Sequence, residues 1–201
     1  LSPSLQNPLK LGADIVMHST TKYINGHSDV IGGAVITNDA KILSKLKFWA
    51  NNLGITGSPF DSYLTLRGLR TLSLRMKQHE QNASALVELL SNHPKISHVY
   101  YPGLKHHPSH EIAKKQQSGF GGMLSFEIKD GLPQVKKFVD DLKILSLAGS
   151  LGGFESLVGH PYTMTHAALS PMQKKGIGIK KNLIRISAGL EDTEDCLLYT
   201  S

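Results

Sequence analysis

The 201-residue sequence predicts a fold of the α/β or α+β class, because strand-like and helix-like segments alternate along the chain. Residues 14–17 and 33–37 are short and rich in β-branched residues. They stand among longer segments in which apolar residues recur every three or four positions, the spacing of a buried helix face. Residues 123–128 alternate between two faces, as a strand that is covered on one side does. This order is typical of neither a helical bundle nor a β-sandwich.

Two helices are expected in the first half of the chain. Asn38 or Asp39 can cap the first, whose apolar residues fall at helical spacing: Ile42, Leu46, Trp49 and Leu53. The second follows Pro59 and ends before Pro94, because proline cannot continue a helix. Its inward stripe contains Leu72, Met76, His79, Ala83, Leu86 and Leu90. A histidine within such a stripe is expected to be packed rather than to bind a ligand.

The second half is expected to form a separate α+β unit. A helix opens at Pro133, and residues 183–187 form a strand in which alternation puts Arg185 on the face opposite its isoleucine neighbours. We place the boundary inside the long helix, near residue 74. This divides the chain into domains of residues 1–73 and 74–201.

The composition narrows the classes of function. The chain has 22 Lys and Arg against 16 Asp and Glu, a net charge of +6, which raises the possibility of nucleic-acid binding. Its lysine pairs are scattered and no block of five like charges occurs, so solvated helix faces and loops explain them better. The single Cys excludes an internal disulfide framework and a Cys-rich zinc module.

Membrane, secretion and metal signals are absent from the sequence. No apolar run approaches the roughly 20 residues that a membrane helix needs. The first residues have neither the basic head nor the apolar stretch of a signal peptide, and the chain does not begin with Met, which suggests the later part of a longer protein. The His-rich stretch 105–110 lacks the spacing of a zinc site and is expected to be a surface loop.

The segment HSTTKYINGHSD, at 18–29, holds the densest set of reactive side chains. Ser19, Thr20 and Thr21 precede Lys22 directly after an expected strand. Hydroxyls and turn amides at such a place can hold a phosphate dianion, and a neutral lysine amine can form a Schiff base. An ordinary surface turn with a solvated lysine fits the same residues. A Walker phosphate loop does not, because no glycine directly precedes Lys22.

Two further segments carry weaker signals. GSLGG, at 149–153, follows an expected strand at 144–148 and lets a ligand approach the backbone, although a plain turn fits as well. Arg185 lies between two isoleucines, so its guanidinium needs a partner. That partner is either the carboxylate of a ligand, held bidentately, or the acidic side chain of a structural ion pair.

Four motifs, in order, resemble those of the Cys/Met-metabolism family of pyridoxal-phosphate-dependent enzymes. STTKYINGHSD at 19–29 resembles the family's lysine motif, and SLGGFES at 150–156, MTH at 164–166 and LIRISAGLED at 183–192 resemble its later motifs. The resemblance covers nearly the whole chain. It implies a fold-type I enzyme, related in fold to aspartate aminotransferase.

In that fold, residues 1–73 correspond to the C-terminal part of the large cofactor-binding domain, and residues 74–201 to the small C-terminal α+β domain. Within the family, WANNLGITG at 49–57 and GFGGMLSF at 119–126 look most like the bacterial cystathionine γ-synthases. FE at 154–155 looks instead like some γ-lyases.

On the cofactor side, Lys22 matches the lysine that carries pyridoxal 5'-phosphate covalently and then moves protons at the substrate Cα. Ser19 and Thr21 match the hydroxyls that hold the phosphate. The resemblance implies no metal.

On the substrate side, Arg185 matches the arginine that grips the α-carboxylate. Ser150 and the backbone of Leu151 match the loop that helps to hold this carboxylate. Glu155 matches a position near the distal end of the substrate.

The resemblance implies an enzyme of sulfur amino-acid metabolism. In the γ-synthase reaction, cysteine replaces the acyl carboxylate of an O-acylhomoserine and gives cystathionine. A cystathionine or methionine γ-lyase and a homoserine-ester sulfhydrylase stay open, because the same residues serve them. Small amino-acid substrates, a homotetramer and a cytoplasmic location are implied, and neither nucleic acid nor a membrane is expected as a partner.

Two departures from the family pattern reduce the activity that we expect. The aspartate that pairs with the pyridine nitrogen, the ring-stacking tyrosine, and the tyrosine and arginine from a neighbouring subunit would all precede Leu1. At the other end, CLLYTS at 196–201 replaces the continuing amphipathic helix of the family. We therefore expect the chain on its own to be weakly active or inactive.

Overall fold

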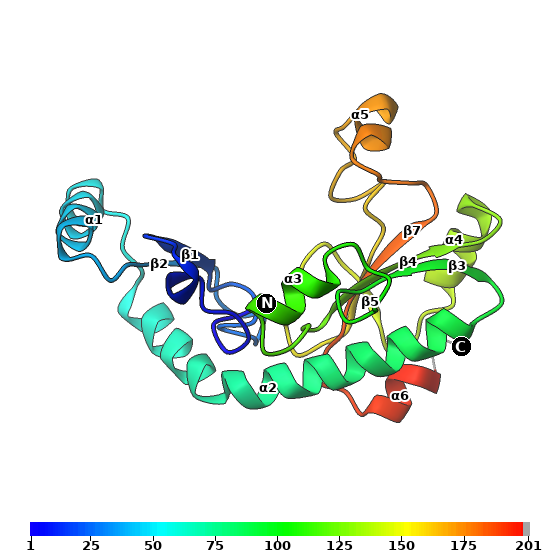
Figure 1. Cartoon of the computed structure of the whole chain (residues 1–201), viewed down its shortest axis with the longest axis horizontal. Coiled ribbons are helices and arrows are strands. Elements are labelled where there is room, and N and C mark those ends of the chain that lie inside the picture. Colours follow the sequence, from blue (N-terminus) through cyan, green and yellow to red (C-terminus); the bar gives the residue numbers. More distant parts are fainter. Residues whose placement is uncertain (199–201) are drawn as a thin grey trace.

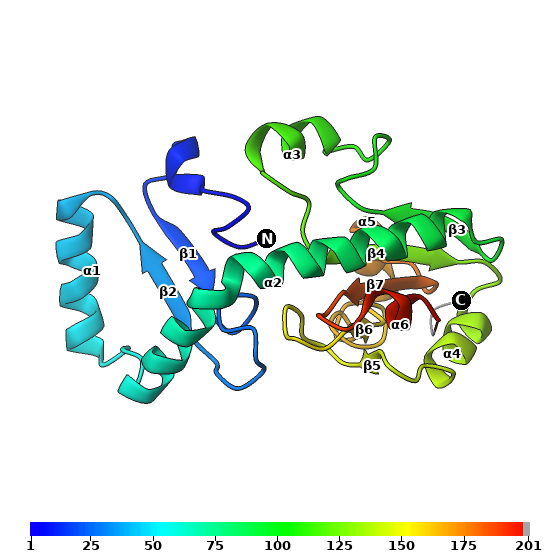
Figure 2. The same ribbon diagram turned by 90° about the horizontal axis from the view of Figure 1, so that it is seen from below.

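The computed structural model describes residues 1–198 and is elongated, with a sheet toward each end of one long helix (Figure 1). The smaller sheet is two-stranded and antiparallel and consists of β1 (Val16–Ser19) and β2 (Gly33–Ile36). After α1 (Ala40–Leu53), the helix α2 (Pro59–Asn92) runs from beside this sheet along the larger one (Figure 2). The mixture of helices and sheets confirms the predicted fold class.

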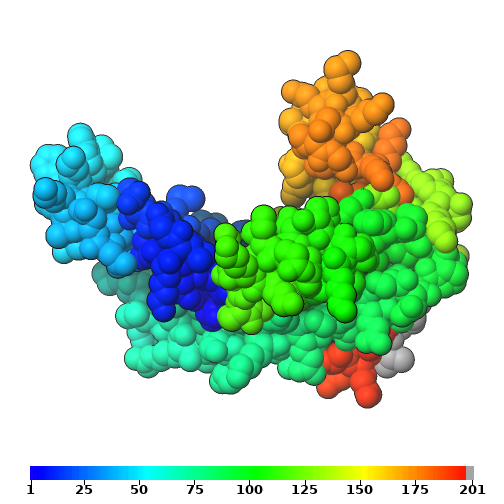
Figure 3. All heavy atoms as spheres, in the orientation of Figure 1, coloured from blue at the N-terminus to red at the C-terminus, as the bar shows by residue number. Residues whose placement is uncertain are grey.

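The larger sheet has five strands in the order β3-β4-β7-β6-β5. β5 pairs in parallel with β6, and the other neighbours are antiparallel. The strands are β3 (Ile96–Tyr100), β4 (Met123–Ile128), β5 (Ser146–Leu147), β6 (Leu157–Gly159) and β7 (Leu183–Ser187). The short helices are η1 (Pro8–Leu11), α3 (His110–Gln116), α4 (Leu132–Asp140), α5 (Pro171–Gly176) and α6 (Thr193–Leu198). The segment that carries α5, orange in Figure 3, projects from the sheet. The surface is hollowed between this segment and the end of the molecule that carries α1, in light blue.

The main core lies between α2 and one face of the five-stranded sheet. Phe126, Ile184 and Ile186 point into it and are 0% exposed. The α2 stripe is buried along its whole length, His79 included, as predicted. The strand 183–187 also forms at the expected residues, with Arg185 on the other face.

α1 begins where the sequence predicts, yet none of its residues is buried. The Asp39 carboxylate caps it by accepting hydrogen bonds from the backbone N–H groups of Lys41 (2.7 Å) and Ile42 (2.9 Å). Trp49 and Leu53, which fall at the helical spacing noted in the sequence, are 56% and 61% exposed. An apolar helix face becomes buried only when another element covers it, and among residues 1–198 none covers this one.

Other boundaries differ from the sequence-based expectations. The first strand starts at Val16 rather than residue 14, because its pairing with β2 begins at Val16 and Ile36. The strand expected over 144–148 shrinks to Ser146–Leu147, which pair with Leu157 and Val158. β3, β6, α3 and α5 were not predicted.

The remaining expectations concern membrane-spanning helices, metal-binding groups and the C-terminal residues. In residues 1–198, no helix is long and apolar enough to cross a membrane. The same part of the chain holds no group of three or more His, Cys, Asp or Glu side chains that could bind a metal ion. Of the divergent end 196–201, residues 196–198 belong to α6, and residues 199–201 lie outside the described part.

Candidate active site

Lys22 lies in a tight turn that directly follows β1. The N–H of Asn25 donates to the carbonyl of Thr20 (2.9 Å), and the N–H of Gly26 donates to the carbonyl of Lys22 itself (2.8 Å). Gly26 has φ of +70°, a left-handed conformation that glycine adopts without strain. The turn leaves Lys22 half-buried, while residues 23–26, which follow it, are buried.

The structure brings Lys22, Ser150 and Arg185 together from three separate segments. The Lys22 Nζ donates to the Ser150 Oγ at 3.0 Å. Arg185 Nη2 donates to the backbone carbonyls of Ser150 (2.8 Å) and Gly149 (3.4 Å). One loop therefore contacts both the lysine amine and the guanidinium.

Arg185 has no acidic partner in the described part of the chain. No carboxylate of residues 1–198 forms an ion pair with it, so the structural ion pair considered above is not made there. Its contacts with the Ser150 loop come from one nitrogen, Nη2. A guanidinium carries five N–H donors, which leaves capacity for a carboxylate.

Tyr23 and Gly152 pack the two loops tightly together. Gly152 has φ of +75°, and a Cβ there would lie 2.8 Å from the backbone nitrogen of Tyr23. The Gly152 N–H donates to Ser187 Oγ at 2.9 Å, which ties this loop to β7. Leu151 packs against the buried cluster formed by Tyr23, Leu72 and Met76. Burial raises the pKa of Tyr23 to about 12, so this phenol stays neutral at physiological pH.

Ser19 and Thr21 flank the turn and differ in how their hydroxyls are engaged. Thr21 Oγ1 accepts from the Gly32 N–H (3.0 Å) and donates to the Gly32 carbonyl (3.3 Å). Ser19 pairs with Gly33 through its backbone, and its side chain is exposed. The Thr21 hydroxyl thus donates its proton to the backbone of Gly32, whereas Ser19 is exposed to solvent.

Glu155 is hydrogen-bonded to Ser28, near the end of the segment 18–29 that contains Lys22. Its Oε1 accepts a hydrogen bond from Ser28 Oγ at 2.7 Å, and its Oε2 is buried without a partner among residues 1–198. Ser28 has φ of +57°, which is unusual for a residue other than glycine. The sequence analysis missed Ser28, and its neighbours carry no pattern that predicts this contact.

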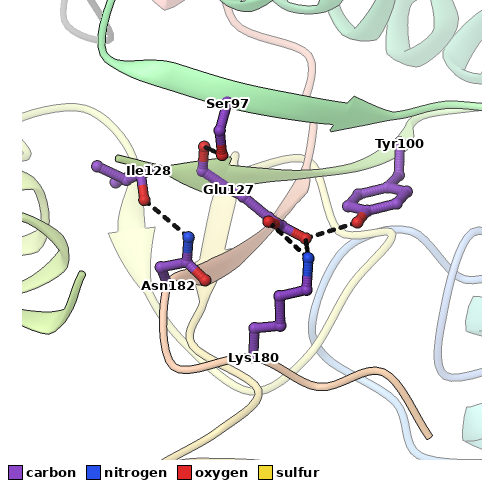
Figure 4. Close-up of polar contacts among 6 residues, drawn as sticks. All are labelled: Ser97, Tyr100, Glu127, Ile128, Lys180 and Asn182. Atoms are coloured by element: carbon purple, nitrogen blue, oxygen red, sulfur yellow. Dashed lines mark hydrogen bonds and ion pairs between the residues drawn. The ribbon is translucent and has the colours of Figure 1, made fainter. Parts of the chain in front are cut away.

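An ion pair, also missed from the sequence, joins the buried Glu127 to the exposed Lys180 on the sheet face that carries Arg185. Ser125 pairs with Arg185 across β4 and β7, and Glu127 follows on the same face of β4. The Glu127 carboxylate accepts hydrogen bonds from Lys180 Nζ and the Tyr100 hydroxyl (Figure 4). The Lys180 Nζ is 2.8 Å from Oε1 and 3.0 Å from Oε2.

This ion pair makes the stability of the fold depend on pH. Burial alone would raise the pKa of Glu127, but the hydrogen bonds from Lys180 and Tyr100 outweigh it and lower this pKa. The charged carboxylate therefore stabilises the fold above the ordinary Glu pKa of about 4.3. That stabilisation is lost as the pH falls through the lowered pKa of the folded chain.

We expect Glu127→Gln to lower the free energy of unfolding by about 1 kcal/mol at neutral pH. Between neutral pH and about pH 3, the variant should lose less stability than the parent chain. Urea unfolding across this range measures both effects. Glu88→Gln, at an exposed glutamate of α2, is the control. Parallel pH profiles for Glu127→Gln and the parent would rule out this role.

Comparison with known proteins identifies the family. The model of the Cys/Met metabolism PLP-dependent enzymes matches residues 1–198. The chain belongs to this family. The resemblance stated from the four motifs is thereby confirmed, and pyridoxal phosphate is the cofactor of the family's enzymes.

The relatives include both synthases and lyases. The chain is 52% identical over 197 residues to cystathionine gamma-synthase of Escherichia coli K12, covering 98% of this chain and 51% of that protein. It is 51% identical over 197 residues to cystathionine gamma-lyase of Dictyostelium discoideum, again 98% of this chain and 51% of that protein. The chain thus spans about half the length of the curated relatives that it matches.

A solved structure supports the fold assignment. Cystathionine gamma synthase from Xanthomonas oryzae pv. oryzae, in complex with aminoacrylate and cysteine, superposes with a TM-score of 0.96 at 55% identity. The match covers 100% of this chain and 52% of that one. The predicted fold-type I assignment is confirmed by this likeness.

Proposed function

We propose that this chain supplies the lysine side of a pyridoxal-phosphate site, in a protein that makes cystathionine from an O-acylhomoserine and cysteine. One observation carries the proposal. The Lys22 amine and the Arg185 guanidinium both contact Ser150, although the three residues lie far apart in the sequence. A group bound to Lys22 and a carboxylate bound to Arg185 would therefore be neighbours.

The residues around Lys22 fit this cofactor. Lys22 is half-buried, and its amine is hydrogen-bonded to the Ser150 hydroxyl rather than to a carboxylate. The exposed Ser19 hydroxyl can donate to a phosphate oxygen, while Thr21 must release the Gly32 carbonyl to do so. When bound, the cofactor supplies the electron sink that makes loss of a γ-substituent possible.

The chain's own residues would bind the amino acid and move its protons. Lys22, once neutral, acts as the base at Cα and carries protons onward. Arg185 holds the α-carboxylate, and Ser150 with the Leu151 backbone borders it. Fixing the carboxylate orients the Cα–H bond toward the lysine, which is an effect of proximity.

Glu155 is assigned to the border of the distal substrate site. Its Oε1 is engaged by Ser28, so a contact with substrate through this oxygen requires that hydrogen bond to open. The unpartnered Oε2 is the atom that could turn toward a ligand without breaking it.

A γ-lyase is the second candidate for the reaction. The Dictyostelium lyase and the Escherichia coli synthase differ by one percentage point in identity to this chain, so likeness alone does not separate them. The residues named above serve either reaction, and a homoserine-ester sulfhydrylase would use them too. We favour the synthase because GFGGMLSF at 119–126 and WANNLGITG at 49–57 look most like that branch.

We also propose how the chain sits in a complete protein. Residues 1–73 would complete a large domain and residues 74–201 would form the small one, with α2 crossing the boundary. The exposed apolar side chains of α1 and early α2, such as Trp49, Leu53 and Phe60, suit a surface that further protein covers. A homotetramer in the cytoplasm follows from the family resemblance.

The test is reconstitution from two parts. The chain is co-expressed with the upstream half of the Escherichia coli relative, supplied with pyridoxal phosphate, and assayed in separate reactions with an O-acylhomoserine plus cysteine and with cystathionine alone. Production of cystathionine, abolished by Lys22→Ala, is the expected result. Cleavage of cystathionine without synthesis would establish the lyase instead. An assembly that binds the cofactor but neither makes nor cleaves cystathionine would contradict both the synthase and the lyase proposals.

A further inference from the structure

Arg75, on α2, lies beneath the turn that carries Lys22. Arg75 is 7% exposed, and no carboxylate of residues 1–198 forms an ion pair with it. A guanidinium buried without a carboxylate must find its hydrogen bonds elsewhere, because an unsatisfied buried charge is strongly unfavourable. Here the partners are backbone carbonyls and one hydroxyl.

The guanidinium of Arg75 joins the lysine turn to the helix. Nη1 donates to the carbonyl of Tyr23 (2.7 Å), and Nη2 donates to that of Ile24 (3.2 Å). Nη2 also donates to the carbonyl of Gly68 (2.7 Å), and Nε donates to Thr71 Oγ1 (2.9 Å). The two turn carbonyls that it binds belong to the two residues directly after Lys22.

Two glycines make room for this contact. A Cβ on Gly26 would lie 2.0 Å from Arg75 Nη1. A Cβ on Gly68 would lie 2.6 Å from the carbonyl oxygens of Ile24 and Asn25. The turn and the helix therefore meet backbone to backbone, and the guanidinium fills the space that remains.

The same helix also holds the segment that follows Arg185. His79 Nδ1 donates to the carbonyl of Ala188 at 2.7 Å. Asn82 Nδ2 donates to the carbonyls of Gly189 (3.1 Å) and Glu191 (2.9 Å). α2 thus fixes the turn after Lys22 at one point and the end of β7 at another.

We propose that Arg75 is a positioning residue that fixes the Lys22 turn on α2 and so sets the spacing between the Lys22 amine and the Arg185 guanidinium. It acts through the carbonyls of Tyr23 and Ile24 and touches no reacting atom. The consequence for cofactor binding rests on the proposed role of Lys22, whereas the anchoring of the turn does not.

Hydrogen exchange of the whole 201-residue chain tests the anchoring. Arg75→Ala removes every donor, and we expect peptides covering residues 20–27 to exchange about tenfold faster or more, because charge-assisted hydrogen bonds are lost. Peptides from β4 and β7 should keep the rates of the parent chain. Guanidinium ion, at a concentration too low to denature, should restore the protection of 20–27 by filling the vacated site. Arg70→Ala, at an exposed arginine of the same helix, is the matched control.

Two further variants keep the test decisive if Arg75→Ala does not fold. Arg75→Lys keeps the charge and loses the planar fork, so protection at 20–27 should fall while the sheet is unaffected. Gly26→Ala should give the same pattern from the side of the turn, because its methyl group displaces the guanidinium.

Unchanged exchange at 20–27 would overturn the proposal. So would equal acceleration throughout the chain without rescue by guanidinium, since Arg75 would then contribute only to general stability. Labelling of Lys22 by pyridoxal phosphate is measured on the same samples. A parent chain that does not label at Lys22 counts against the proposed function, whereas the exchange comparison is unaffected by it.

Discussion

Phe126→Ala is expected to lower the free energy of unfolding of the five-stranded sheet and α2 by about 3 to 5 kcal/mol, the usual cost of truncating a buried phenylalanine. Phe126 is 0% exposed and lies on β4, between β3 and β7. Its ring meets Phe138 edge to face, with centroids 5.7 Å apart. Truncation leaves a cavity in the middle of this core, because a sheet held on both sides cannot collapse to fill it.

Urea unfolding followed by circular dichroism measures this loss. Phe48→Ala is the control, because Phe48 is 58% exposed on α1 and should change stability by about 0.5 kcal/mol or less. Similar losses for the two variants would mean that the core is not where the structure puts it.

Arg185→Met is expected to raise the KM for the amino-acid substrate about 10²- to 10⁴-fold in the two-part assembly, because two charge-assisted hydrogen bonds to a carboxylate are lost. The kcat should fall as well, since a substrate that is not clamped presents its Cα–H bond in the wrong direction. The hydrogen bonds from Arg185 to Ser150 and Gly149 are lost too, so part of the effect comes through the loop.

Arg185→Lys separates charge from geometry. A single ammonium keeps the attraction to the carboxylate and loses the planar fork, so we expect a smaller rise in KM than for Arg185→Met. Initial rates at varied substrate concentration give both constants. A KM that neither variant changes would show that the carboxylate binds elsewhere.

The elements that were predicted correctly are those with a strong local pattern. β7 alternates along its whole length, and the apolar stripe of α2 repeats without interruption, so both were found at the expected residues. A cap at Asn38 or Asp39 was predicted because a short polar side chain before an amphipathic segment satisfies free backbone N–H groups, and Asp39 is the residue that does so.

The elements that were missed have weak or mixed patterns. β3 contains exposed polar residues within ISHVY, and β6 has three residues, too few to show alternation. The apolar spacing of α1 predicted a helix, and spacing cannot say whether a partner element covers its apolar face.

Within the candidate site, the sequence drew attention to certain residues, but it did not predict their contacts. Lys22 was singled out by the resemblance of its motif to the family's, and Arg185 by its place between two isoleucines, where a guanidinium needs a partner. The bond from Arg75 to the Tyr23 carbonyl spans 52 residues, and that from Ser28 to Glu155 spans 127. Such contacts depend on how α2 and the loops pack, which no local pattern encodes.

The central claim is that this chain builds a pocket in which Lys22 binds pyridoxal phosphate. The most direct measurement is to mix the purified chain with the cofactor, reduce with borohydride and map the modified peptide by mass. We predict a pyridoxyl group mainly on Lys22, which Lys22→Ala removes without shifting it to another lysine. Equal labelling of many lysines, unchanged by Lys22→Ala and persisting after the upstream half is supplied, would contradict the claim.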